Sequence, residues 1–233
     1  MTDSLKSSLL GAALAFVFGF LGAAAWSYSG MGDARTRAYL LENPELLPQM
    51  ADAYQRAEAE KRLASVKGDV MDPFPGAILG NPNGTKTLVE FTDYNCPYCR
   101  ASMGDLTKLI EQEPELKVVV REWPIFRGSD LAARMALAAA KQGKYAEFHD
   151  AMFRLSPATP ESINQAAREV GMDLAQAQKD GASPEIEQEL ARNYSLAQQL
   201  GFTGTPSWVT EHSIFEGAIG LEGLRRSLEP VDD

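Results

Sequence analysis

The chain contains two cysteines, and both lie in one tetrapeptide, Cys96-Pro97-Tyr98-Cys99. An apolar segment typical of a buried strand, Thr87-Leu88-Val89-Glu90-Phe91, precedes the tetrapeptide, and a segment with helical spacing follows it. A cysteine at the start of a helix lies among unpaired backbone N–H groups at the positive end of the helix dipole, which favours the thiolate. The second thiol lies one turn further along, where the pair can close a reactive disulfide and pass it on. The pattern therefore indicates a redox centre.

Two other uses of the cysteine pair stay open at this point. A structural zinc site needs four ligands, and the only histidines available are His149 and His212, which are far apart and lack finger-like spacing. A structural disulfide closing so short a loop would remove little entropy from the unfolded chain. Both readings are weaker than the redox reading, so we expect no metal site and no cofactor other than the cysteine pair.

Residues 9–26 form eighteen consecutive residues without a charge. As a helix this segment would reach roughly 27 Å, which is close to the thickness of a bilayer core. We therefore expect an uncleaved membrane anchor. The alternative is a signal sequence removed near Ala25, because Ala23-Ala24-Ala25 resembles the small-residue pattern before a cleavage site. Either way, a disulfide-exchanging domain belongs outside the cytosol.

The charge of the chain argues against nucleic-acid binding. The formal net charge is −10, and no Lys/Arg cluster forms a basic face. With 45% hydrophobic residues in 233, the part after the leader is large enough for one full core and an appendage.

Three regions follow from the pattern along the chain: a leader and spacer over 1–32, a helical region over 33–70, and a main domain over 71–233. In the helical region, Asn43-Pro44-Glu45 predicts the start of a helix that runs to about Ser65, with Asn43 as its cap. This helix has a narrow apolar stripe that consists of Leu47, Met50, Tyr54 and Ala57. We expect the stripe to mediate either self-association or packing on the main domain.

A run of turn signals over 70–84 separates the helical region from the main domain. The strand at 87–91, a helix to about Gln112 and a second strand at 116–122 predict a parallel β-α-β unit. Helical spacing then dominates from about 129 to 200, as an all-helical insertion. Sheet signals return at 207–210 and 213–216, and a helix at 221–228 closes the domain, so we expect an α/β fold.

The segment Glu90-Phe91-Thr92-Asp93-Tyr94-Asn95-Cys96-Pro97-Tyr98-Cys99 resembles the active site of the DsbA family of thioredoxin-fold thiol:disulfide oxidoreductases. Gly204-Thr205-Pro206-Ser207 is similar to the cis-proline loop of that family. The front segment, Tyr39 to Leu47, is similar to the N-terminal helical region of the ScsC-like branch. The resemblance implies a thioredoxin-like fold with a helical insertion, and it covers about residues 72–228.

The resemblance also implies roles for individual residues. Cys96 is the expected nucleophile, and Cys99 is the expected resolving thiol. Pro97 suits the first helical turn, and Tyr98 can cover the disulfide or meet a substrate. Thr205 and the cis-bonded Pro206 would offer backbone to a substrate peptide for strand-like pairing.

Glu90 lies where the family keeps a buried acid. A carboxyl in a strand otherwise made of Leu, Val and Phe would have a raised pKa and could relay protons to the cysteines. The alternative is that strand alternation turns Glu90 to solvent.

Other conspicuous side chains have plainer interpretations. His149 fits the packing or the surface of an amphipathic helix, and His212 fits a turn. Trp123 and Trp208 flank predicted strands and fit either a peptide groove or the core.

The expected function is therefore the formation, reduction or isomerisation of disulfides in exported polypeptides, on the periplasmic side of a bacterial inner membrane. The expected partners are those polypeptides, a membrane redox partner, and further copies of the chain bound through 33–70. Tyr98 and Thr205 depart from the best-known oxidase of the family, which puts strong oxidising power in doubt. A different class also remains: an exported binding or chaperone module whose cysteine pair is structural.

Overall fold

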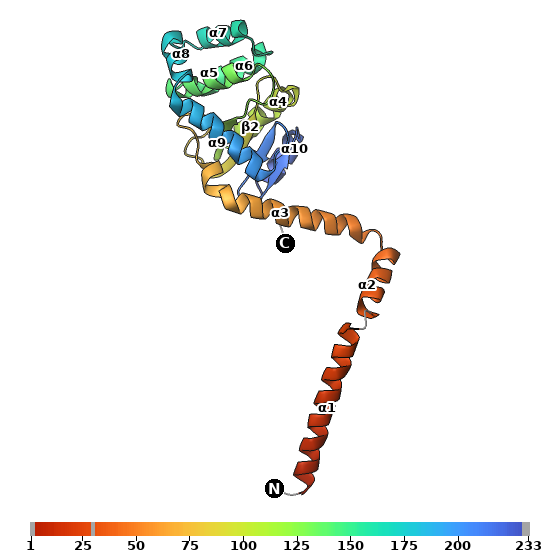
Figure 1. Cartoon of the computed structure of the whole chain (residues 1–233). Helices are drawn as coiled ribbons and strands as arrows, with labels where there is room; N and C mark the ends of the chain where they lie inside the picture. Colours follow the sequence, from red (N-terminus) through yellow and green to blue (C-terminus); the bar gives the residue numbers. More distant parts are fainter. Residues whose placement is uncertain (1–2, 29–30, 230–233) are drawn as a thin grey trace. The chain divides into compact units, whose positions relative to one another are not determined.

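The computed structural model describes residues 3–28 and 31–229 (Figure 1). The chain divides into two compact units, Met1–Gln55 and Arg56–Asp233. The first unit contains α1 (Asp3–Tyr28), α2 (Met31–Glu42) and the beginning of α3 (Leu46–Met71). Among the described residues, no helix combines the length and the apolar character that a membrane crossing requires. The membrane anchor expected at residues 9–26 thus has no support there.

The predicted start of the third helix is wrong. Asn43 does not cap α3; instead its side-chain amide and its backbone N–H both donate to the Tyr39 carbonyl, at 2.7 and 3.0 Å, and so it terminates α2. The helix α3 begins at Leu46 and continues to Met71, beyond the predicted end at Ser65. It continues because its last three turns have a buried apolar side, made of Leu63, Val66 and Val70.

A five-stranded sheet of order β1-β3-β2-β4-β5 forms the centre of the second unit. Its strands are β1 (Ile78–Gly80), β2 (Lys86–Thr92), β3 (Leu116–Glu122), β4 (Ser207–Val209) and β5 (Ile214–Glu216). The parallel β2–β3 pair, joined by α4 (Pro97–Gln112), confirms the predicted β-α-β unit. All other pairs are antiparallel. The sequence did not predict β1, a three-residue edge strand inside the run of turn signals, because so short a strand shows no alternation.

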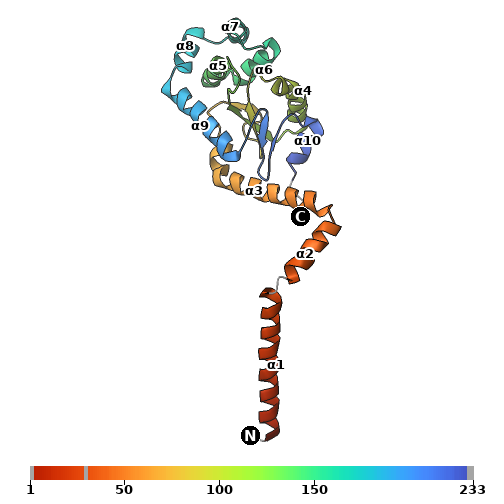
Figure 2. The same ribbon diagram turned by 45° about the vertical axis from the view of Figure 1, so that its right-hand side comes forward.

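The predicted helical insertion is confirmed. It consists of α5 (Asp130–Lys141), α6 (Tyr145–Leu155), α7 (Pro160–Glu169), α8 (Leu174–Gly181) and α9 (Pro184–Leu200). The side chains of Thr159, Asp173 and Ser183 accept hydrogen bonds from the first turns of α7, α8 and α9, as N-caps do. Figure 2 shows α5 to α8 gathered at one end of the second unit, while α9 returns along the sheet.

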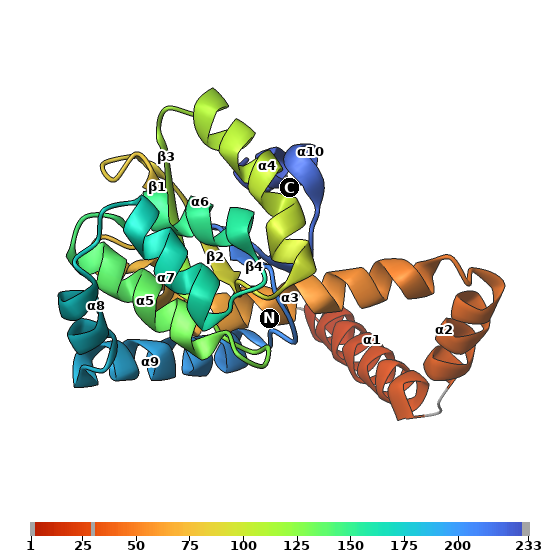
Figure 3. The same ribbon diagram turned by 90° about the horizontal axis from the view of Figure 1, so that it is seen from above.

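Both faces of the sheet are covered. One apolar cluster joins Leu88, Val118, Val120 and Trp208 to residues of α4, α5, α6 and α10 (Gly220–Ser227). A second cluster joins Val89, Phe91, Val119 and Val209 to residues of α3 and α9. Seen from above in Figure 3, α4 and α10 lie side by side, in agreement with their packing in the first cluster. Since β2 and β3 occupy the middle of this sandwich, the last five residues of each strand are buried.

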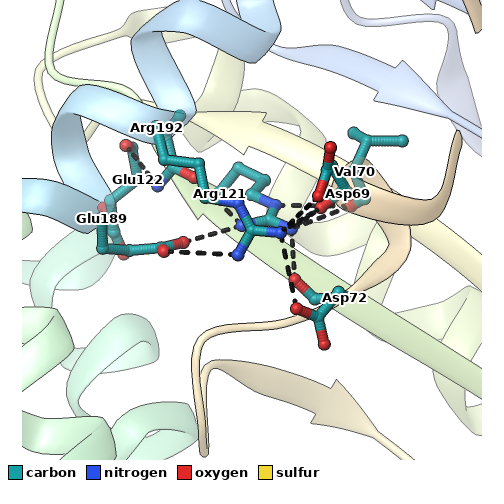
Figure 4. Close-up of polar contacts among 8 residues, drawn as sticks. Asp69, Val70, Asp72, Arg121, Glu122, Glu189 and Arg192 are labelled. Carbon is teal, nitrogen blue, oxygen red and sulfur yellow. Dashed lines mark hydrogen bonds and ion pairs between the residues drawn. The ribbon is translucent and has the colours of Figure 1, made fainter. Parts of the chain in front are cut away.

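One consequence is a fully buried guanidinium, that of Arg121 near the end of β3 (Figure 4). Its Nη1 donates to Glu189 at 2.7 Å and to the Asn193 side chain at 3.2 Å, both on α9. Its Nη2 donates to the backbone carbonyls of Asp69 and Val70, at 2.6 and 3.2 Å, and also to the carbonyl of Asp72. This single side chain therefore ties the end of α3 and the segment after it to the sheet and to α9.

Burial acts against both charges of this ion pair. It lowers the pKa of Arg121, and it raises the pKa of Glu189 although the guanidinium opposes that shift. The hydrogen bonds to carbonyl oxygens offset part of the desolvation cost that the ion pair alone would leave.

We predict that Arg121→Ala lowers the free energy of unfolding by about 3–5 kcal/mol, because it leaves Glu189 with only its 3.8 Å contact to Arg192 and removes the donor to the buried Val70 carbonyl. Arg192→Ala is the matched control: Arg192 contacts Asp69, Asp72 and Glu189 from a partly exposed position, and its loss should cost about 1 kcal/mol or less. Chemical denaturation measures both. Equal losses in the two variants would contradict the role given to Arg121.

Candidate active site

The cysteine pair lies where β2 ends and α4 begins, as the sequence predicts. Cys96 is the N-cap residue of α4, with extended backbone, and Pro97 occupies the first helical turn. Cys99 lies in the first turn and is fully buried. Both thiols are free, and the Cys96 side chain is only 1% exposed. Pro97 and Tyr98 lie on the surface beside them, and Tyr98 is 65% exposed. Tyr98 is therefore accessible to another molecule.

The predicted cis-proline loop faces the cysteines. The Thr205-Pro206 bond is cis, which confirms the expectation from the family resemblance. The antiparallel register that pairs Phe91 with Ser207 brings this loop to the end of β2 that leads to Cys96. The Cys96 thiol donates to the Thr205 carbonyl, with 3.1 Å between Sγ and O. Thr205 is thus in direct contact with the expected nucleophile.

Two polar residues hold the segment between β2 and the cysteines. The Asp93 carboxylate accepts from the backbone N–H groups of Asn95 and Phe126, at 2.7 and 2.8 Å, and from the Ser129 hydroxyl. The Asn95 side chain accepts from the Ala158 N–H at 2.8 Å and donates to the Arg127 carbonyl at 3.4 Å. The turn that carries Cys96 is therefore tied to the entrance of the helical insertion and to the loop between α6 and α7.

Glu90 is buried, so the expectation that alternation could turn it to solvent is wrong. Neither of its carboxyl oxygens has a hydrogen-bond partner among the described residues. Burial raises the pKa of Glu90 to about 8, and the hydroxyl of Thr92 opposes this shift without forming a hydrogen bond of standard geometry. Burial also raises the pKa of Cys99 far above its usual range, and a charge on Glu90 raises it further. The protonation state of Glu90 therefore affects the pKa of Cys99, and the reverse holds as well.

The remaining sequence candidates lie away from the thiols or in the core. Trp123 packs edge-on against Phe91, and Trp208 stacks on Phe215, so both tryptophans are core residues and the groove interpretation is wrong for them. His212 lies exposed in the β4–β5 turn, as predicted. Because β4 runs antiparallel to β2, that turn is at the opposite end of the sheet from Cys96. His149 is fully buried, with its Nδ1 2.9 Å from the Tyr94 hydroxyl.

Sequence reasoning missed a second buried carboxyl, that of Glu122 at the end of β3. Its Oε1 accepts hydrogen bonds from Tyr94 and Tyr145, at 2.9 and 2.7 Å. Burial raises the pKa of Glu122 to about 8. In Val-Val-Val-Arg-Glu, the last two residues look like an ordinary polar strand end. The signal that could have predicted the burial of Glu122 was the parallel β-α-β unit, because parallel strands are normally covered on both faces.

A five-stranded mixed sheet, a dithiol at the start of a helix and a facing cis-proline define a thioredoxin-fold protein with a dithiol centre. A family model described as a DSBA-like thioredoxin domain matches residues 87–229. The chain belongs to this family, whose fold and site serve thiol–disulfide exchange.

Solved structures agree with this assignment. A thioredoxin-like oxidoreductase from Silicibacter pomeroyi DSS-3 is 44% identical, with a TM-score of 0.65 over 69% of this chain and 94% of that one. The thiol-disulfide exchange protein alpha-DsbA2 from Wolbachia pipientis is 28% identical, with a TM-score of 0.68 over 75% and 96%. A linker-deletion and N6K mutant of Proteus mirabilis ScsC is 26% identical, with a TM-score of 0.69 over 87% and 93%.

The curated relatives that match are longer proteins. A Na(+)/H(+) antiporter NhaA from Herminiimonas arsenicoxydans is 29% identical over 161 residues, which are 68% of this chain and 26% of that protein. A second antiporter of this name, from Salinispora tropica, is 25% identical over 158 residues. The chain thus spans about a quarter of the length of the curated relatives it matches.

We predict that Glu90→Gln stabilises the protein in a pH-dependent manner. The folded-state pKa of Glu90 lies above its unfolded value, so the unfolded state loses the proton first and wild-type stability falls as pH rises from about 4.5 to about 8. The advantage of the variant should therefore grow across this window, by up to about 5 kcal/mol, and then level off. Urea denaturation from pH 4 to 9 measures it.

Glu111→Gln, on the exposed side of α4, is the control that makes the same charge change in solvent. Its stability relative to wild type should stay constant with pH. An equally constant difference for Glu90→Gln would contradict the burial of a neutral carboxyl at position 90.

Proposed function

We propose that this protein exchanges disulfides with polypeptides outside the cytosol, with Cys96 as nucleophile and Cys99 as resolving thiol. The observation that carries the proposal is the contact of the Cys96 thiol with the Thr205 carbonyl at the cis-proline loop, with Cys99 buried behind it. A backbone carbonyl next to the reactive sulfur lets a substrate chain align beside it in an extended conformation. Because Cys96 is covered, a substrate sulfur reaches it only after neighbouring groups move aside.

In the donating direction, a substrate thiolate attacks Cys96 Sγ of the oxidised pair. The bond between Cys96 and Cys99 breaks, its electron pair moves to Cys99, and Cys99 takes a proton from Glu90. A second substrate thiolate then attacks the substrate sulfur of the mixed disulfide and releases Cys96. Two electrons pass from the substrate to the protein, and a substrate disulfide forms. The reducing direction runs through the same steps in reverse.

The raised pKa values support these roles. A carboxyl with a pKa of about 8 carries its proton at neutral pH, so Glu90 can donate it to the departing Cys99. The strongly raised pKa of Cys99 makes its departing thiolate a ready proton acceptor. Above about pH 8 Glu90 is ionised; it then assists the opposite step, in which Cys99 gives up its proton and attacks the mixed disulfide.

Export also belongs to this proposal, because a disulfide-exchanging centre works in an oxidising compartment. The N-terminal segment would direct the chain to the periplasmic side of a bacterial inner membrane. A membrane redox partner would reset the cysteine pair after each cycle.

The test is to trap mixed disulfides in cells that express the full chain. With Cys99→Ser, Cys96 still attacks substrate disulfides but no thiol resolves the product, so we expect adducts that reductant removes. Cys96→Ser, the matched control, should form none. Acid quenching, alkylation and mass spectrometry of cell fractions identify the adducts. A folded Cys99→Ser variant without adducts would favour a binding module with a structural cysteine pair, and adducts confined to cytosolic proteins would contradict export.

We also propose that the chain self-associates through its helical region, 33–70. In the first unit, large apolar side chains are more than half exposed: Tyr39, Leu41, Leu47, Met50 and Tyr54. Leu47, Met50 and Tyr54 follow the spacing of a helical contact stripe on α3. A self-associated form with reduced thiols suits isomerisation of wrong disulfides, whereas a monomer kept oxidised suits donation.

We expect sedimentation to give the full chain a mass that is a multiple of 25.4 kDa. Replacing Leu47 and Met50 by Glu should return it to a single copy, because charges on the stripe would be buried at the interface. Gln49→Glu, on another side of the same helix, should leave the mass unchanged. A wild-type chain that sediments as a monomer would refute the proposal.

A further inference from the structure

Glu90 and Glu122 lie on the same face of the sheet. In the parallel β2–β3 pair, Thr92 is opposite Glu122 and Glu90 is opposite Val120. Side chains two residues apart on a strand share a face, and so do directly paired residues, so Glu90, Thr92 and Glu122 all face the side covered by α4 and α6. Glu122 is thus the diagonal neighbour of Glu90. Both side chains are completely buried.

Glu122 is held in place by two tyrosines and, through one of them, by His149. Tyr94 and Tyr145 donate to its Oε1. Burial lowers the pKa of His149 to about 3, so this imidazole is neutral. With its proton on Nδ1, His149 donates to the Tyr94 oxygen, 2.9 Å away, and leaves the Tyr94 proton free for Glu122. This arrangement fixes the carboxyl through Oε1 alone.

The other oxygen of Glu122 is free to titrate. Glu122 Oε2 is buried and has no hydrogen-bond partner among the described residues, like both carboxyl oxygens of Glu90. A proton can therefore enter or leave Oε2 without breaking a hydrogen bond of the Tyr94–Tyr145–His149 set. The site consequently contains two carboxyls that can each hold one exchangeable proton, and a charge on one of them, Glu90, raises the pKa of Cys99.

We propose that Glu122 is a positioning residue for thiol–disulfide exchange: as the second member of a carboxyl pair, it determines the pH at which Glu90 gives its proton to Cys99. The inference rests on the proposed function of the cysteine pair. Two negative charges in one buried site repel each other, so the pair loses its two protons in separate steps. While Glu122 keeps its proton, Glu90 can release and regain its own proton. Once Glu122 is ionised, Glu90 retains its proton more strongly.

The electrostatics of the pair agree with this geometry. Beyond burial, the charges of Asp93 and Glu90 raise the pKa of Glu122, while the two tyrosine hydroxyls lower it. Such an interaction is reciprocal, so a charge on Glu122 raises the pKa of Glu90 by an equal amount. The titratable or charged groups that face the pair are Asp93 and Tyr94 after β2, Cys99 on α4, and Tyr145 and His149 on α6. Arg121 points to the opposite face of the sheet, toward α9.

The test is a carboxyl ¹³C NMR titration of the full reduced chain labelled at glutamate. Wild type should show two interacting steps, assigned with Glu90→Gln and Glu122→Gln. In Glu122→Gln the midpoint of Glu90 should fall by about one pH unit or more, because the neighbouring charge is gone. In Glu90→Gln the midpoint of Glu122 should fall as well, by an amount set by which carboxyl ionises first in wild type. Glu111→Gln, which removes an exposed charge, should move neither.

Tyr145→Phe keeps the test decisive if Glu122→Gln does not fold. It removes one hydrogen bond that favours ionised Glu122, so Glu122 should keep its proton to higher pH and Glu90 should again titrate lower. The pH profile for reduction of the Cys96–Cys99 disulfide by dithiothreitol should shift in the same direction. A Glu90 midpoint that is unchanged in both variants would overturn the proposal. The NMR midpoints do not depend on turnover, so a failure of the proposed exchange with polypeptides would appear separately, as the absence of trapped adducts.

Discussion

The burial of β2 and β3 on both faces is the constraint on which the rest of the structure depends. A parallel pair in the middle of a sheet, with helices on either side, leaves no solvent for side chains at its carboxyl ends. Those ends nevertheless carry Glu90, Arg121 and Glu122, all without exposed surface. An isolated buried charge is too costly to keep, so each of these groups must be paired or neutral.

The two faces solve this problem in different ways. On the face toward α9, Arg121 keeps its charge and is neutralised by Glu189 and a set of carbonyl oxygens, which fastens α3 to the domain (Figure 4). On the face toward α4, Glu90 and Glu122 keep their protons instead. Charge pairing thus holds the elements together on one side, and the other side buries two carboxyls whose pKa values are raised. Alternation along β3 places Arg121 and Glu122, adjacent in sequence, in these two opposite settings.

The sequence by itself determined the parts that local chemistry specifies. The placement of Cys96 and Cys99 at a strand-to-helix junction, the β-α-β unit and the helical insertion follow from periodicity, caps and cysteine spacing, because these signals act over a few residues. The burial of Glu90 and the cis bond before Pro206 came only from the resemblance to a family, since neither can be derived from local pattern.

Only the tertiary structure decided which residues, distant along the chain, lie opposite one another. Asn43 could equally begin one helix or end another, and its hydrogen bond to Tyr39 chose the second. The edge strand β1 exists because β3 offers it a partner. Glu122 looked like a polar strand end, yet its register beside Thr92 and the tyrosines across from it place it in the interior. Burial and protonation depend on residues far apart in the chain, which local sequence pattern does not encode.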